Sequence, residues 1–142
     1  MVTIRPRKIR IVAWIAAAIV VVVFSAIATA LTGSTGAGTA VFQRGDQLAM
    51  IGLGVAAALA ILMLTRPRVI ADEHGIRIRN VIGGYDLPWQ IVRAVRFERG
   101  HAWASLELAD DDVVAVMAVQ AADKAYAVEA IRQLRELHAA AM

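Results

Sequence analysis

Cysteine is absent from this 142-residue sequence, and proline, aromatic and charged residues are few. Without cysteine the chain has no disulfide, no lipid anchor through a cysteine, no thiol nucleophile and no thiolate zinc site. Only 19% of the residues are charged and 59% are hydrophobic, against roughly 25% and about 45–50% in soluble domains. Most of this apolar excess precedes Arg66, so the chain divides into an apolar half and a mixed half.

Positive charge is also unevenly placed. The formal net charge is +3, yet residues 72–142 hold eight basic and eleven acidic side chains. A nucleic-acid-binding protein gathers positive charge on the folded surface that meets phosphate. Here the basic residues flank apolar segments instead, so we expect no nucleic-acid partner.

Two apolar segments predict a transmembrane hairpin within an N-terminal region of residues 1–65. Ile11–Leu31 contains 21 residues, and as a helix it would be about 31 Å long, close to the roughly 30 Å of a hydrocarbon core. Leu48–Leu64 adds 17 uncharged residues. Burial in a protein core is the alternative for each helix, but so small a chain cannot bury two helices that are apolar all round. The lipid bilayer is therefore an expected partner.

Basic residues in the short flanks set the expected orientation, because they favour the cytoplasmic side. The connecting loop, residues 32–47, has one arginine, Arg44, which Asp46 offsets. The outer flanks are more basic, with Arg5, Arg7, Lys8, Arg10, Arg66 and Arg68. We therefore expect a multi-pass protein of the cell membrane with both termini cytoplasmic.

A cleaved signal peptide is an alternative for the first span, because Ala28-Thr29-Ala30 is typical of a cleavage site. The apolar run exceeds the about 7–15 residues of a usual signal peptide, which favours a retained helix. In the second span Gly52, Ala56 and Ala60 recur at four-residue spacing. Small residues allow helices to approach closely in lipid, so these three could pack the hairpin or form a homo-oligomer.

After Pro67 the hydrophobic pattern changes to period two, which is typical of half-buried strands. Turn-forming residues separate the runs, as in Gly83-Gly84 and Asp110-Asp111-Asp112. The pattern predicts a six-strand antiparallel meander, with strands near residues 69–72, 75–81, 84–88, 92–99, 102–108 and 113–117.

The last segment changes to helical period. The pattern predicts Asp123 as its N-cap. One apolar stripe follows, formed by Ala127, Ala130, Ile131, Leu134, Leu137 and Ala141. The predicted fold class is therefore an α+β membrane protein, in which a two-helix hairpin precedes a cytoplasmic β domain, residues 66–142, capped by a C-terminal helix.

Several segments of this region, in this order, resemble the bacterial pleckstrin-homology (PH) domain of actinobacterial membrane proteins of the low-molecular-weight protein antigen 6 type. They are Arg66-Pro-Arg68, Gly75-Ile-Arg-Ile-Arg-Asn80, Pro88-Trp89, Trp103-Ala-Ser-Leu-Glu-Leu108 and the closing Ala-Ile-Arg-Gln-Leu-Arg-Glu-Leu137. The resemblance implies a PH-like split barrel and no established biochemical activity. PH domains usually have seven strands, whereas the sequence pattern indicates six.

The resemblance also raises the possibility of a lipid headgroup site. Arg66, Arg77 and Arg79 fit the basic spacing of inositol-phosphate-binding PH domains, and Arg68 adds possible contact with anionic lipid. Against a specific site, the loop from Asp72 to Gly75 is acidic where a phosphate would need positive charge.

Nothing in the sequence predicts an enzyme, a cofactor or a metal site. Asp110-Asp111-Asp112 lacks the ligand pattern of a calcium loop, and the three histidines are isolated from one another. We expect a non-enzymatic, membrane-anchored PH-like interaction module that is an accessory partner of other membrane or cytoplasmic proteins. The alternative is a sensor of anionic lipid headgroups that uses Arg77 and Arg79.

Overall fold

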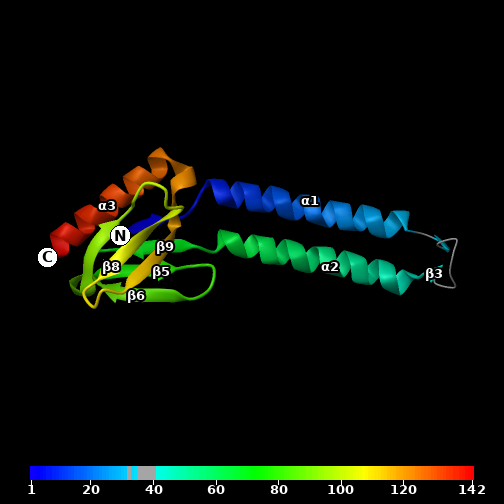
Figure 1. Cartoon of the computed structure of the whole chain (residues 1–142), viewed down its shortest axis with the longest axis horizontal. Coiled ribbons are helices and arrows are strands. Elements are labelled where there is room, and N and C mark those ends of the chain that lie inside the picture. Colours follow the sequence, from blue (N-terminus) through cyan, green and yellow to red (C-terminus); the bar gives the residue numbers. More distant parts are fainter. Residues whose placement is uncertain (32, 35–40) are drawn as a thin grey trace. The chain divides into compact units, whose positions relative to one another are not determined.

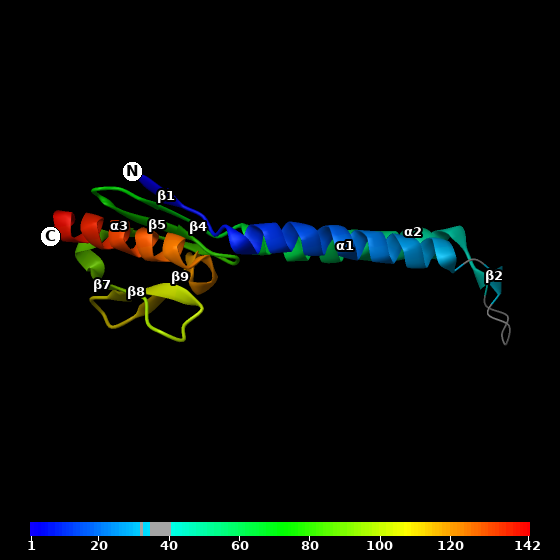
Figure 2. The same cartoon turned by 90° about the horizontal axis from the view of Figure 1, so that it is seen from above.

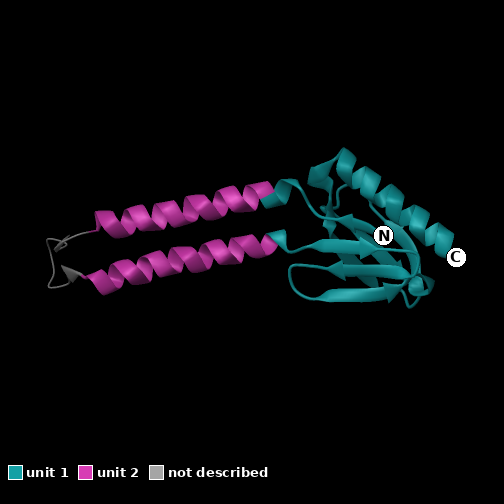
Figure 3. Ribbon diagram, turned by 180° about the vertical axis from the view of Figure 1, so that it is seen from behind, with its two compact units in different colours: residues 1–10, 65–142 teal, residues 11–64 magenta. Residues whose placement is uncertain are grey.

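The computed structural model describes residues 1–31, 33–34 and 41–142. They form two compact units, residues 11–64 and residues 1–10 with 65–142 (Figure 3). The predicted division at residue 66 is therefore wrong for the N-terminus, because residues 1–10 belong with the β domain.

The unit of residues 11–64 is a pair of helices (Figure 1). Helix α1 spans Lys8–Ala30, of which residues 8–10 belong to the β domain, and α2 spans Arg44–Leu62, followed by a 3₁₀ turn, η1, at Met63–Thr65. Both are long and apolar enough to cross a membrane. The second begins four residues before the predicted Leu48, and Asp46 accepts a hydrogen bond from the Gln43 backbone N–H at 2.9 Å in its first turn.

Between these helices, short strands β2 (Gly33–Ser34) and β3 (Val41–Phe42) pair with each other. Two parts of the predicted loop, residue 32 and residues 35–40, lie outside the described residues.

The helix contact in this unit does not use the predicted stripe. A Cβ added to Gly54 would lie 2.6 Å from the Phe24 Cβ, so only glycine permits this approach. Gly52, Ala56 and Ala60 are exposed on another face. The hairpin-packing role expected for these three is therefore wrong, because two residues along a helix turn the side chain to a different side. Their role in a homo-oligomer stays a prediction.

The β domain has seven strands within residues 1–10 and 65–142, all of which are described. The six predicted strands are present as β4 (Arg68–Ala71), β5 (Gly75–Arg79), β6 (Gly84–Pro88), β7 (Val92–Arg96), β8 (Trp103–Leu108) and β9 (Val113–Gln120). The seventh, β1, is Val2–Ile4, and it precedes the helical hairpin in the chain.

These strands form two antiparallel sheets rather than one continuous meander. The orders are β1-β4-β5-β6 and β7-β8-β9, and Figure 2 shows the two sheets on opposite sides of the domain. The break follows Pro88, which has no N–H to donate, and the 3₁₀ turn η2 at Trp89–Ile91. The predicted barrel is therefore not closed.

Helix α3, Ala125–Ala141, packs against this β structure. Four residues of the predicted stripe, Ala127, Ala130, Ile131 and Leu134, are buried. Leu137 and Ala141 pack against the core from its edge. The predicted capping helix is confirmed.

The core also contains the side chain of Trp89, which is fully buried. Its Nε1–H donates to the Asp72 carbonyl at 2.7 Å, and its ring lies 5.6 Å from that of His138. Asn80 joins the two sheets, because its amide donates to the Ala115 carbonyl at 2.9 Å and accepts from the Met117 N–H at 3.2 Å.

Candidate functional site

The start of α1 is fixed by the β domain. Asp123 is 7% exposed, and its carboxylate accepts the backbone N–H groups of Arg7 and Lys8 at 3.0 and 2.9 Å. The first N–H groups of a helix have no partner within it, so Asp123 caps α1 from 115 residues away. The prediction that Asp123 caps the C-terminal helix is wrong, since Lys124 holds that position.

Tyr126, in the first turn of α3, also contacts the residues that precede α1. The guanidinium of Arg7 lies 4.1 Å from the Tyr126 ring centroid, and the Arg5 N–H donates to the Tyr126 hydroxyl at 3.4 Å. The chain segment between β1 and α1 is therefore held against the first turn of α3.

Five arginines surround one cavity of about 290 Å³ in the β domain, together with Thr65 and Pro67. We call it the arginine cavity, and the five are Arg5, Arg10, Arg66, Arg68 and Arg79. Arg68 and Arg79 belong to β4 and β5. Arg5 directly follows β1, and Arg10 lies in the first turn of α1. Its lining includes no acidic residue.

A second cavity of about 440 Å³ adjoins the first, because Arg66, Arg68 and Arg79 line both. It contains the fourth predicted lipid contact, Arg77, whose Nη2 lies 2.6 Å from the Asp86 carboxylate. Arg77 is therefore neutralised and lies outside the arginine cavity. Sequence reasoning missed Arg5 and Arg10, which it assigned only to the orientation of the hairpin.

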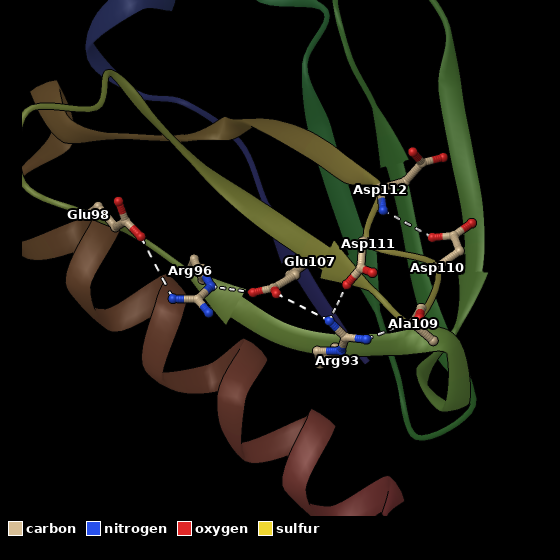
Figure 4. Close-up of polar contacts among 8 residues, drawn as sticks. All are labelled: Arg93, Arg96, Glu98, Glu107, Ala109, Asp110, Asp111 and Asp112. Atoms are coloured by element: carbon tan, nitrogen blue, oxygen red, sulfur yellow. Dashed lines mark hydrogen bonds and ion pairs between the residues drawn. The ribbon is translucent and has the colours of Figure 1, made fainter.

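The arginines of the second sheet are also neutralised (Figure 4). Arg93 pairs with Asp111 and, at 3.5 Å, with Glu107. Arg96 pairs with Glu107 and, at 3.8 Å, with Glu98. The hydrogen bond and charge of Asp111 raise the pKa of Arg93. Carboxylates outnumber arginines on this surface, three to two, so it offers little attraction to an anion.

Acidic groups near the β4–β5 turn and on α3 have local structural partners. The Asp72 carboxylate accepts backbone N–H groups of His74 and Gly75 at 2.9 and 3.2 Å, which lowers its pKa. On α3, hydrogen bonds from Arg132 hold the pKa of Glu129 below its ordinary value.

Groups of three or more histidine or acidic residues arranged for a metal ion do not occur in the part of the chain that the structure describes. Asp110-Asp111-Asp112 forms a turn in which the Asp112 N–H donates to Asp110 at 3.2 Å. His138 contacts the Val92 carbonyl through Nε2 at 2.7 Å.

An apolar groove of about 580 Å³ lies along α3. Phe97 lines it from beyond β7, and Val128, 65% exposed, and Ile131 line it from the helix. Arg132, Arg135, Glu136 and Ala139 complete its border.

Comparison with known proteins identifies the family. A model described as bacterial PH domain matches residues 66–137, about half of the chain. This chain belongs to the bacterial PH domain family. The matched region runs from the residues before β4 into α3, and it leaves out β1.

Mycobacterial relatives extend the similarity over the helices. The uncharacterized protein Rv1417 of Mycobacterium tuberculosis is 38% identical over 136 residues, which are 96% of this chain and 87% of that protein. The uncharacterized protein Mb1452 of Mycobacterium bovis matches to the same extent. Low molecular weight protein antigen 6 of M. tuberculosis is 33% identical over 67 residues, 47% of this chain and 59% of that protein. No solved structure matches the chain. The resemblance to bacterial PH proteins is confirmed, and that family is generally non-catalytic.

Proposed function

We propose that this protein is a non-enzymatic, membrane-anchored PH-like module that holds its β domain at the cytoplasmic face of the membrane and binds a protein partner there. The pairing of β1 with β4 carries the proposal. Ile4 lies opposite Val69 in this ladder, although the whole apolar hairpin separates them in the chain. Paired strands must lie on one side of a membrane, and two crossings by α1 and α2 satisfy this requirement.

The surfaces of the two helices support their insertion in lipid. Large apolar side chains on both are exposed, including Ile11 at 63%, Val22 at 65% and Leu48 at 71%. A core helix of a soluble protein would bury these side chains, whereas a bilayer solvates them. Trp14, 60% exposed, lies toward one end of α1, where an aromatic ring favours the headgroup zone.

The same pairing argues against cleavage after Ala30. A signal peptidase acting there would remove β1, and Ile4, which is 2% exposed in the core, would be lost from the first sheet. The basic residues on the β-domain side of both helices favour a cytoplasmic location for this domain.

A protein partner fits a domain that is already tethered. Holding a domain at the membrane raises its effective concentration toward other membrane-bound proteins without any new contact. The apolar groove along α3 supplies exposed apolar surface of the kind that protein contacts use. We assign the partner to this groove, which the exposed Val128 lines.

Cysteine labelling tests the topology, and because the sequence has no native cysteine, only the introduced residue can react. Thr3→Cys, Ser34→Cys and Ala140→Cys are labelled in cells with a membrane-impermeant maleimide. We expect Ser34→Cys to react in intact cells, and the other two to react only after permeabilisation. Reaction of Thr3→Cys in intact cells would refute the arrangement.

Site-specific photocrosslinking tests the partner. A photoreactive residue at Val128 in the full chain should give one discrete crosslinked protein in the native membrane, and the same residue at the exposed Ile82, outside the groove, should not. Adding Glu136→Lys on the groove border should weaken the Val128 crosslink. Identical products from both positions would contradict a docking role for the groove.

A further inference from the structure

On the outer face of the first sheet, two neighbouring rows of cross-strand residues differ in how their charges are paired. In one row Arg77 lies opposite Asp86, and the pair forms a charged hydrogen bond of 2.6 Å. In the next row Arg68 lies opposite Arg79, and the residue opposite Arg79 on the other side is Gly84. Like charges directly opposite each other destabilise a sheet. The second row therefore maintains an unfavourable arrangement that the first row avoids.

The imbalance extends around the arginine cavity. None of its five arginines takes part in an ion pair among the described residues, whereas Arg77, Arg93, Arg96 and Arg132 each have a carboxylate partner. Four other arginines also form no ion pair among the described residues, but none of them lines this cavity; they are Arg7, Arg44, Arg99 and Arg135. A bound anion would remove the repulsion between the five arginines of the cavity.

We propose that the arginine cavity binds the phosphate group of an anionic membrane lipid. A guanidinium group presents its N–H donors in a planar fork that matches two phosphate oxygens, and it remains charged at any physiological pH. Cross-strand placement of Arg68 and Arg79 lets two such forks approach one phosphate from adjacent strands. Arg5, Arg10 and Arg66 add positive charge around it.

Chain connectivity favours a lipid as the source of the phosphate. Arg10 lies in the first turn of α1, and Arg66 directly follows η1 at the end of α2. If these helices cross the bilayer, the cavity lies within a few residues of the headgroup zone, so the choice of lipid over free phosphate rests on the membrane anchoring proposed above. Anionic headgroups also attract basic residues there.

The site differs from the one that the sequence spacing indicated. Arg77 is excluded by its pair with Asp86, and the acidic loop from Asp72 to Gly75 does not line the cavity. Arg5 enters it from the N-terminal strand segment. The ligand is therefore held by residues that lie on both sides of the hairpin in the sequence.

The test uses the full chain in a neutral maltoside detergent, so that it does not depend on the topology experiment. Short-chain phosphatidylglycerol, short-chain phosphatidylcholine and inorganic phosphate are titrated separately, and binding is followed by native mass spectrometry and by the thermal midpoint. Arg68→Gln/Arg79→Gln is compared with Arg77→Gln/Arg99→Gln, which removes the same charge outside the cavity.

We expect phosphatidylglycerol to bind at least tenfold more tightly than phosphatidylcholine and to raise the midpoint. The cavity variant should bind it on the order of 30-fold more weakly, and the control variant should keep most of the affinity. Arg68→Lys/Arg79→Lys should recover only part of the loss, because an ammonium group cannot form the bidentate contact.

Equal binding of the two lipids, or equal losses in the cavity and control variants, would overturn the site. If inorganic phosphate alone matched phosphatidylglycerol in affinity, the cavity would be a site for free phosphate and the lipid assignment would be wrong. Failure of the cysteine-labelling topology would leave these binding results unchanged, so the two proposals fail separately.

Discussion

Replacing Ile4 with alanine tests whether the N-terminal strand belongs to the β domain. Ile4 is 2% exposed, it is part of the buried core cluster, and it lies opposite Val69 in β4. Truncation of a buried isoleucine to alanine costs about 2–5 kcal/mol. β1 is an edge strand of three residues that can partly close the gap, so we expect about 2–3 kcal/mol.

The matched control is Ile82→Ala, because Ile82 makes the same chemical change at a side chain that is 87% exposed. Urea unfolding of the full chain in neutral detergent would be followed by tryptophan fluorescence. Replacing Trp14 and Trp103, which are 60% and 42% exposed, with phenylalanine leaves the buried Trp89 as the reporter of the β-domain core.

At a denaturant slope of about 1.5 kcal/mol/M, the expected loss lowers the urea midpoint of Ile4→Ala by about 1.3–2 M. The control should stay within about 0.5 kcal/mol of the parent. If both variants unfold at the same midpoint, β1 does not stabilise the domain and the pairing argument for a two-span hairpin is lost.

Four further changes give distinct expectations for the same unfolding assay. Leu134→Asp places an unpaired charge under α3, where the side chain is fully buried, and should cost about 3–5 kcal/mol; a smaller loss than in Ile4→Ala would contradict the packing of α3. Asp123→Ala removes the cap of α1 and should cost about 1–2 kcal/mol, with Asp123→Asn intermediate. Lys124→Gly should raise the free energy of unfolding by about 1 kcal/mol, because Lys124 has φ +48° and ψ −115°, and Lys124→Ala should not. Asp72 has a folded pKa below its ordinary value of 3.8, so its stabilisation is present above about pH 4 and is lost as the pH falls through the folded pKa; Asp72→Asn should lose less stability between pH 5 and pH 3 than the parent.

Local sequence patterns predicted most of the β domain. Six strands and the C-terminal helix occur within a few residues of their expected positions, because one face of each strand is buried and period-two alternation follows from that. In β5 the buried Ile76 and Ile78 alternate with the exposed Arg77 and Arg79. The turns could be predicted from their glycines. Gly83 has φ +76°, a backbone conformation that few other residues adopt.

Strand β1 could not be predicted in this way. Val2-Thr3-Ile4 is too short to show a period, and its partner in β4 lies across the hairpin. Strand β1 is ordered by its pairing with β4 and by the burial of Ile4, and neither produces a pattern in the local sequence. The available hint was the count of six strands in a family that usually has seven.

Asp123 illustrates the second kind of miss. An aspartate before an amphipathic stripe is typical of an N-cap, and that pattern favoured α3. The structure places Lys124 between Asp123 and the helix with a positive φ, and the carboxylate reaches the start of α1 instead. A capping residue and its helix can thus be distant in the chain, and propensity at one position cannot identify which helix receives the cap.

Arg5 and Arg10 flank the apolar helices and also line the arginine cavity, and the sequence interpretation gave them only the first of these roles. Basic residues in such flanks favour a cytoplasmic location, so the presence of Arg5 and Arg10 needed no further reason. Orientation alone does not require Arg68 and Arg79 to face each other across two strands, because charge at any nearby position would serve. The strand register thus separates the two roles. Variants at Arg68 and Arg79 can remove the proposed phosphate contacts and change only one residue of the basic flanks, Arg68, while Arg5, Arg10 and Arg66 remain.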